Sequence, residues 1–204
     1  VVGTNVPFHV MLRKPLEMAG VPLYLNMINS YEDVLKSVDD FGRMAGKEKE
    51  AAAKRAQIEK DYAELTQDVQ KGKGPKVLII FGSPDSFNMS TKLSFSGDLV
   101  KRLGGVNIAD KAENVKDSSF IPLSMEFVAK ENPDVVLLIT MGGSKEILEK
   151  LRSNMRDNAI WHDVNAVKNN RVYQLPPSLF TVNPGTHTID AMKIMKEYMY
   201  GDVK

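Results

Sequence analysis

The feature that most constrains the fold is a long charged segment, Lys47–Lys71, which contains neither glycine nor proline. It is rich in alanine, glutamate, lysine and glutamine, which favour the helix strongly. Its apolar positions recur every three or four residues as one narrow stripe, formed by Ile58, Tyr62, Leu65 and Val69. The segment therefore predicts one continuous helix, about 35 Å long at 1.5 Å per residue, with a solvated charged face.

A stiff helix in this position indicates two lobes held at a fixed distance, because ordinary linkers are flexible and rich in Gly, Ser or Pro. We expect residues 1–28 to be the remnant of an N-terminal lobe, most of which lies outside these residues. Residues 29–73 then carry the helical connection, which we call the interlobe spine helix, and residues 74–204 form a C-terminal α/β lobe. This organisation suits a receptor that holds a ligand between lobes better than an enzyme.

The segments before the spine helix indicate a strand–helix–strand unit followed by a capped helix. The chain opens on VVGTN, which predicts a buried strand, and continues with a helix over Pro7–Ala19 and a strand over Val21–Leu25. Ser30, with Asp33 three residues later, resembles a capping box that opens the next helix. Because two strands are marginally stable alone, we expect residues 1–25 to be mobile or to pair with a neighbouring molecule.

The remaining residues alternate between strands and helices. Lys76–Phe81 and Val135–Thr140 are continuous apolar runs, typical of strands that are covered on both faces. Shorter strands are expected at Val106–Ala109 and Arg171–Leu175, and a loop over Gly82–Ser94. Helices are expected near residues 96–103, 124–131, 144–154 and 186–200. The fold class is therefore α/β: a C-terminal lobe with a mainly parallel sheet flanked by helices, preceded by the spine helix and a partial β-α-β unit.

Composition excludes several classes of function. A net charge of +1 gives no electrostatic case for nucleic acid as a ligand. The absence of cysteine excludes disulfides, thiolate catalysis and thiolate-bound metals. The three histidines, His9, His162 and His187, are scattered, and no nucleophile stands with a base. A flavodoxin-like or doubly wound cofactor-binding enzyme domain stays open as the alternative, because the sheet alone fits it equally well.

Candidate ligand-binding residues stand where the predicted strands end. In sheets of this kind, ligands bind outside the carboxyl ends of the strands. The candidates are Phe87 and Met89 after the first buried strand, Met141, Gly142 and Gly143 after the second, and Phe180 after the third. A cleft lined by aromatic, thioether and small groups suits a large, flat and largely apolar ligand.

Several motifs, in one order, resemble a known family. They are Ser94–Asn107, with its helix and Gly-Gly-x-Asn, Ser124-Met-Glu126 before Glu131–Asp134, and Trp161 with AVKNNRVY at 166–173. This set resembles the helical-backbone substrate-binding proteins of metal-chelate ABC importers, closest to the haem-receptor lipoproteins of Gram-positive surface iron-uptake systems. The resemblance covers nearly the whole chain, with residues 1–72 similar to half an N-lobe plus the spine helix and residues 75–200 to a complete C-lobe.

The resemblance implies binding without catalysis. Haem or a ferric-siderophore-type compound is held between the lobes and delivered to an ABC permease, and the protein needs no cofactor of its own. It also implies an extracytoplasmic location, as a cell-surface lipoprotein or in the periplasm, with membrane contact only through a lipid anchor outside these residues. Haem, a siderophore and a corrinoid all stay open as ligands.

Individual roles follow from the same resemblance. Met141 stands where the haem receptors carry an iron-ligating histidine, and a thioether is an axial ligand that favours reduced iron; the alternative is a methionine that only packs on the ligand. His187 is the second candidate for iron or a propionate, with a solvated histidine as the alternative. Asn5 completes the ligand-binding set. Glu126 matches the carboxylate that docks on permease arginines, a position that the helix dipole also favours.

The family's other axial ligand comes from the early N-lobe. The resemblance places that part of the lobe before the first residue of this sequence. We therefore expect these 204 residues alone to bind haem weakly.

Overall fold

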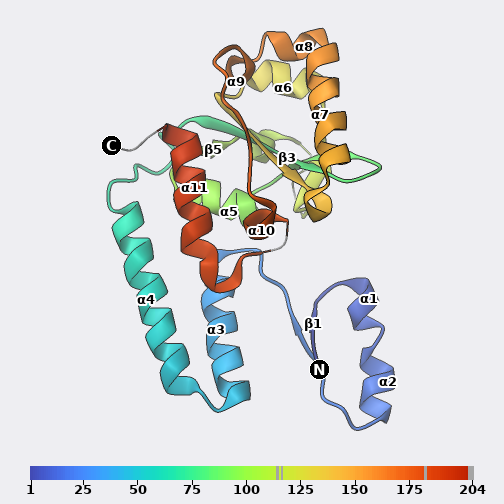
Figure 1. The fold of residues 1–204 in the computed structure, drawn as a ribbon, viewed down its shortest axis with the longest axis vertical. Coiled ribbons are helices and arrows are strands. Elements are labelled where there is room, and N and C mark those ends of the chain that lie inside the picture. The colour runs from blue at the N-terminus through green and yellow to red at the C-terminus, as the bar shows by residue number, and fades with distance from the viewer. Residues whose placement is uncertain (114, 116, 182, 202–204) are drawn as a thin grey trace.

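The computed structural model describes residues 1–113, 115, 117–181 and 183–201. Its centre is a six-stranded mixed sheet in the C-terminal lobe (Figure 1). The strands are β3 (Lys76–Gly82), β4 (Phe87–Ser90), β5 (Val106–Asn107), β6 (Phe120–Pro122), β7 (Val135–Thr140) and β8 (Val172–Gln174). The sheet order is β6-β4-β3-β7-β8, and β5 pairs with the start of β3. The β3–β5, β3–β7 and β7–β8 pairs are parallel, whereas β3–β4 and β4–β6 are antiparallel.

Both faces of the sheet are covered, which explains the continuous apolar runs inside its central strands β3 and β7. Val77 and Ile79 of β3 point into one core and Leu78 and Ile80 into the other, and all four are fully buried. The first core contains residues of α3 (Tyr31–Ala45), α4 (Glu48–Thr66), α5 (Phe95–Arg102) and α11 (Thr188–Tyr200). The second contains residues of α6 (Met125–Glu131), α7 (Lys145–Asp157) and α8 (Ala159–His162), including the buried Trp161.

Short elements complete the lobe. They are the helices α9 (Asn165–Lys168) and α10 (Pro177–Phe180) and the 3₁₀ turns η1 (Ile108–Lys111), η2 (Met141–Gly143) and η3 (Gly185–His187). The predicted fold class, a mainly parallel sheet flanked by helices, is confirmed. Within the described residues, every helix is too short or too polar to cross a bilayer.

The predicted spine helix is present but belongs to a helical hairpin. α3 and α4 lie side by side beneath the lobe (Figure 1), and Gly46, with a φ of +64°, makes the turn between them. Gly42 of α3 lies so close to α4 that a Cβ atom there would stand 2.3 Å from the Cβ of Ala51. Only Ile58 of α4 is buried, so the charged face is solvated as expected.

The expected end of this helix at Lys71 is wrong, because α4 stops at Thr66. The Thr66 hydroxyl donates a hydrogen bond to the carbonyl of Tyr62, and Lys196 of α11 donates one to the carbonyl of Leu65. Threonine bonded back to its own helix weakens the last turn, and the lysine satisfies a terminal carbonyl. A contact with α11, far away in sequence, therefore helps to define this end.

The N-terminal segment is a parallel pair of strands joined through two short helices, so the β-α-β connectivity is confirmed. β1 (Val2–Thr4) pairs with β2 (Tyr24–Asn26), and α1 (Pro7–Val10) and α2 (Arg13–Met18) lie between them. The single predicted helix is wrong, because residues 11–12 form a turn that separates α1 from α2. In an unbroken helix, the ring of Pro15 would clash with the carbonyl four residues earlier, which is that of Met11. The predicted burial of the first strand is also wrong: Val2 is 56% exposed, and Thr4 is exposed as well.

The loop expected over Gly82–Ser94 is wrong in part, because it contains β4. β4 alternates between the two faces, with Met89 in one core and Ser90 on the opposite face. Because Asn88 and Ser90 are polar, β4 is not a continuous apolar run and its sequence does not predict a buried strand. The division of the chain at residues 28 and 73 stays a prediction.

The N-terminal pair is attached to α3 through side chains of β2. The Tyr24 hydroxyl donates to a carboxylate oxygen of Asp40 at 2.6 Å, and the Asn26 amide donates to the Ser37 hydroxyl at 2.7 Å. Asp40, almost completely buried, also pairs with Lys36 and Arg43. Hydrogen bonds from Lys36 and Tyr24 lower the pKa of Asp40 to about 2.

This lowered pKa predicts an acid-sensitive contribution to stability. The ionised Asp40 stabilises the fold above an unfolded-state pKa of about 4, and the contribution is lost as the pH falls from about 4 to about 2. We expect about 1 kcal/mol, since the exposed Lys36 and Arg43 are screened by solvent. Urea unfolding at pH 5 and pH 2.5 measures it, and Asp40→Asn should reduce the difference between the two. An unchanged difference in that variant contradicts the prediction.

Candidate ligand-binding site

The carboxyl ends of β3, β7 and β8 meet at one edge of the sheet, since these three strands are parallel. Directly after β7 comes the turn η2, and after β8 comes α10, which contacts η2. Met141 opens η2 and is 46% exposed. The Met141 side chain is therefore exposed at this edge, and its contact with a ligand stays a prediction.

Gly142 and Gly143 both adopt positive φ angles, +60° and +69°. A Cβ atom on Gly143 would stand 2.9 Å from the Pro177 side chain of α10, whereas one on Gly142 would meet nothing within 4 Å. Gly143 thus permits a close approach of η2 and α10. Gly142 leaves the surface beside Met141 open.

Aromatic side chains form an apolar wall next to this turn. Phe81, the last residue but one of β3, lies against Phe120 of β6, with ring centroids 5.2 Å apart. Phe180 of α10 is buried and lies in the same core as Ile139. Phe120 is partly exposed. The edge therefore presents aromatic carbon as well as a thioether.

This wall encloses one side of a cavity of about 160 Å³, which we call the serine cavity. Its polar side comprises Asn29, Ser90, Ser94, Ser96, Ser119, Thr181 and Asn183. Its apolar side includes Phe81, Phe95, Phe120, Ile139 and Phe180. The cavity therefore combines aromatic carbon with hydroxyl and amide groups at the N-terminus of α5.

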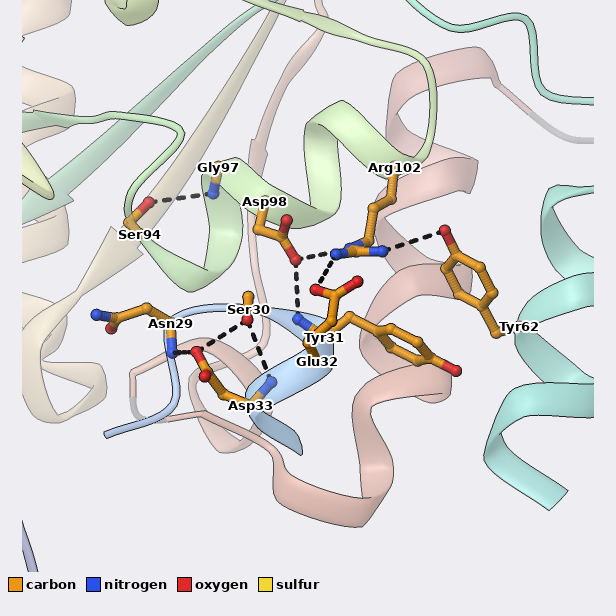
Figure 2. Close-up of polar contacts among 10 residues, drawn as sticks. All are labelled: Asn29, Ser30, Tyr31, Glu32, Asp33, Tyr62, Ser94, Gly97, Asp98 and Arg102. Atoms are coloured by element: carbon orange, nitrogen blue, oxygen red, sulfur yellow. Dashed lines mark hydrogen bonds and ion pairs between the residues drawn. The ribbon is translucent and has the colours of Figure 1, made fainter. Parts of the chain in front are cut away.

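The N-terminus of α5 is built locally. Ser94 is its N-cap, and its hydroxyl accepts a hydrogen bond from the Gly97 amide at 3.1 Å (Figure 2). The same hydroxyl donates to the carbonyl of Thr91 at 2.7 Å. A Cβ atom at Gly97 would stand 2.0 Å from that carbonyl oxygen, so only glycine allows α5 to begin so close to the end of β4.

A polar cluster around Arg102 holds α5 against the helical hairpin (Figure 2). Arg102 pairs with Asp98 on its own helix at 2.7 Å and with Glu32 of α3, and it donates to the Tyr62 hydroxyl of α4 at 3.3 Å. Asp98 also accepts from the Tyr31 amide at 2.9 Å. These contacts fix the start of α3 next to the serine cavity.

The rings in this cluster are stacked. Tyr31 and Tyr62 lie with centroids 4.3 Å apart, and the Arg102 guanidinium stands 5.0 Å from the Tyr31 ring centroid. Burial raises the pKa of Tyr31 to about 12. The phenol therefore stays neutral at physiological pH, and the cluster is structural rather than acid–base machinery.

Two of the predicted ligand-binding residues, Met89 and Phe87, do not line the serine cavity. Met89 is only 2% exposed and packs in the core beside α7, so its proposed contact with a ligand is wrong for this structure. The reason is strand alternation: β4 turns Ser90, not Met89, toward the serine cavity. Phe87 lies half-buried against that same second core.

The other predicted residues lie away from the cavity. His187 is at the start of α11 with a side chain 71% exposed, and its Nδ1 stands 3.0 Å from a carboxylate oxygen of Asp190. Asn5 follows β1 on the exposed N-terminal pair, where its amide donates to the carbonyl of Asn26. Glu126 is exposed in the first turn of α6. The structure therefore brings together Met141, Gly142, Gly143 and Phe180, but not these three.

Sequence reasoning missed the polar side of the cavity. The Ser94-Phe-Ser-Gly motif belongs to the set that carries the family resemblance, and its serines are the signal for this cavity in the sequence. Ser90, Asn29 and Asn183 come from separate parts of the chain and meet only in the fold. Within the described residues, no group of three or more His, Asp or Glu side chains is placed to hold a metal ion.

Comparison with known proteins identifies the family of this chain. The sequence model of the family described as periplasmic binding protein matches residues 16–179. The high-affinity heme uptake system protein IsdE of Staphylococcus aureus is 30% identical over 207 residues. That alignment covers 97% of this chain and 70% of the relative.

Solved structures agree with the sequence comparison. An ABC transporter substrate-binding protein from Listeria monocytogenes EGD-e gives a TM-score of 0.84 at 27% identity, covering 99% of this chain and 76% of that one. S. aureus IsdE complexed with heme gives 0.83 at 26% identity, covering 98% and 76%. With its family match over most of the sequence and the same fold, the chain belongs to the periplasmic binding protein family.

Proposed function

We propose that this chain is the substrate-binding component of an ABC importer, which captures haem or a ferric-siderophore-type compound between two lobes and delivers it to a permease. The observation that carries the proposal is the edge formed by η2 and α10. There an accessible thioether, Met141, stands beside Gly142 and close to a wall of aromatic side chains. Such an edge suits one face of a flat, largely apolar ligand.

Haem is the ligand that we favour. The relative with 30% identity is a heme uptake protein, and IsdE, whose structure was solved with heme, has the same fold. A thioether is an accepted axial ligand of haem iron, whereas siderophore iron is already coordinated by the chelator's own oxygens and needs no such ligand. We also propose that Met141 is that ligand and that the protein performs no chemical conversion.

A binding experiment tests the proposal directly. Haemin is titrated into the protein and the Soret band is followed, with iron-free protoporphyrin IX as the matched control. We expect a saturable, iron-dependent shift of the band, because ligation needs the metal while stacking on aromatic side chains does not. A ferric hydroxamate siderophore, followed by calorimetry, is the competing ligand. The proposal fails if neither iron compound binds in a saturable manner.

We propose that Glu126 docks the receptor on its permease outside the cytoplasm, where a lipid anchor beyond these residues holds it at the membrane. Its exposed position in α6 supports this role. Loss of one partner of a charge pair weakens docking by about 2 kcal/mol or more, so Glu126→Gln should lower uptake by reconstituted permease more than about tenfold. Haemin binding should not change. The exposed Glu149 of α7 is the control position, and normal uptake by Glu126→Gln contradicts the assignment.

A further inference from the structure

The serine cavity is too small for the ring of a large ligand. Its volume is about 160 Å³, below the roughly 300 Å³ at which pockets for whole small molecules begin. It lies between the N-terminus of α5 and the aromatic wall, in which Phe180 belongs to α10, the helix that contacts η2. The cavity therefore has the size and the place of a subsite for one side arm of a ligand bound at that edge.

One side chain of the cavity has no polar partner. Ser90 is 0% exposed, and within the described residues its hydroxyl makes no hydrogen bond. A buried hydroxyl without a partner is unfavourable by about 1–3 kcal/mol. The backbone carbonyl of Ser90 is already used by Asn107, at 2.8 Å, so the free hydroxyl is the part of this residue that remains for a ligand.

The helix beside Ser90 adds further donors and a positive potential. The amides of Phe95 and Ser96 open α5 and have no acceptor within the helix. The aligned peptide dipoles of the helix favour a negative group at this end. The Ser96 hydroxyl lies 3.4 Å from that of Ser94. Hydroxyl and amide donors thus converge where a negative charge is favoured.

The carboxylates near the cavity are held away from it. Asp98, in the first turn of α5, is engaged by the Tyr31 amide and by Arg102, and Figure 2 shows its carboxylate directed toward α3. Asp33 accepts from the Asn29 amide at 3.0 Å and from the Ser30 hydroxyl at 2.8 Å. Arg102 therefore offsets the charge of Asp98, while Asp33 is held by neutral donors at the start of α3.

From these contacts we infer that the serine cavity binds a carboxylate side arm of the captured iron compound. The inference rests on the proposed function and names the chemistry of its ligand: a flat iron chelate whose ring lies at η2 and whose carboxylate enters the cavity. The Ser90 hydroxyl and the first amides of α5 donate to the carboxylate oxygens. A chelate without such an acid group leaves the cavity unused.

Esterification of the ligand tests the inference. Haemin and its dimethyl ester are titrated into the wild type and Ser90→Val. In the wild type the diacid should bind about tenfold more tightly, and in Ser90→Val the preference should fall to about twofold or less. Ser153→Ala, on the outer surface of α7, is the matched control and should keep the preference. The inference is overturned if the wild type binds acid and ester alike, or if Ser90→Val weakens both equally.

A second readout needs no porphyrin and separates this inference from the proposed function. Sodium propionate is added to ¹⁵N-labelled protein, with propionamide as the neutral control. The amide resonances of Phe95 and Ser96 should shift with propionate alone, and Ser90→Val should remove the effect. If haemin fails to bind but propionate shifts these resonances, the proposed ligand is wrong and the carboxylate site stands. If propionate and propionamide act alike, the inference is wrong.

Discussion

Met141→Ala should weaken the binding of haemin by at least about tenfold, the equivalent of about 1.4 kcal/mol. The expectation follows from the exposed thioether directly after β7, beside the open surface at Gly142. Loss of an axial sulfur should also change the spin state of the iron, seen in the visible bands. Because axial methionine raises the haem potential, the reduction potential of the complex should fall.

Substitutions at two other positions distinguish the loss of an iron ligand from a loss of stability. Met192 is fully buried in α11, so Met192→Ala should lose about 2–5 kcal/mol of stability and keep the haemin spectrum. His187→Ala should also keep the spectrum, since this imidazole faces Asp190 and does not line the serine cavity. Identical spectra and affinities for Met141→Ala and the wild type remove Met141 as the ligand, and a loss in His187→Ala assigns the role to that histidine.

Gly42→Leu should destabilise the helical hairpin by about 2–3 kcal/mol. At this position α3 and α4 approach so closely that a Cβ atom on Gly42 would overlap the side chain of Ala51. The same Cβ atom would stand 3.5 Å from the carbonyl oxygen of Lys47. A leucine therefore forces the two helices apart and opens the core around Ile58. The midpoint of urea unfolding measures the loss.

The control is a leucine introduced at an exposed position of the same hairpin. Ala52 is exposed on α4, and Ala52→Leu should change the free energy of unfolding by less than about 0.5 kcal/mol. The contrast isolates helix packing from any general effect of an added leucine. Equal midpoints for Gly42→Leu and Ala52→Leu contradict the close packing of α3 and α4.

The parts of the fold that depend on local signals were predictable from the sequence. The continuous apolar runs gave β3 and β7 because strands covered on both faces need no polar residues. Ser30 and Asp33 gave the start of α3, where the serine hydroxyl accepts from the Asp33 amide at 3.2 Å. Ser144 gave the start of α7 in the same way. Each of these capping contacts joins residues only three positions apart, so it can be predicted from the local sequence.

The parts that depend on distant contacts were not predictable. β4 is a short segment of mixed polarity and β6 is only three residues long; β4 pairs with the edge of β3, and β6 pairs with β4. The serine cavity joins Asn29, Ser90, Ser96 and Asn183, which lie in four different segments. Met89 was assigned to the ligand because it follows a strand. Its burial depends on which face β4 presents to α7, and a one-residue change of register reverses that.

The attachment of β2 to the hairpin determines how the N-terminal pair can move. Asn26 bonds to α3, and three residues later the Asn29 amide is held by Asp33 of the same helix. The connecting stretch therefore cannot serve as a free joint. Any displacement of the strand pair relative to the C-terminal lobe therefore has to move α3 with it or break these hydrogen bonds.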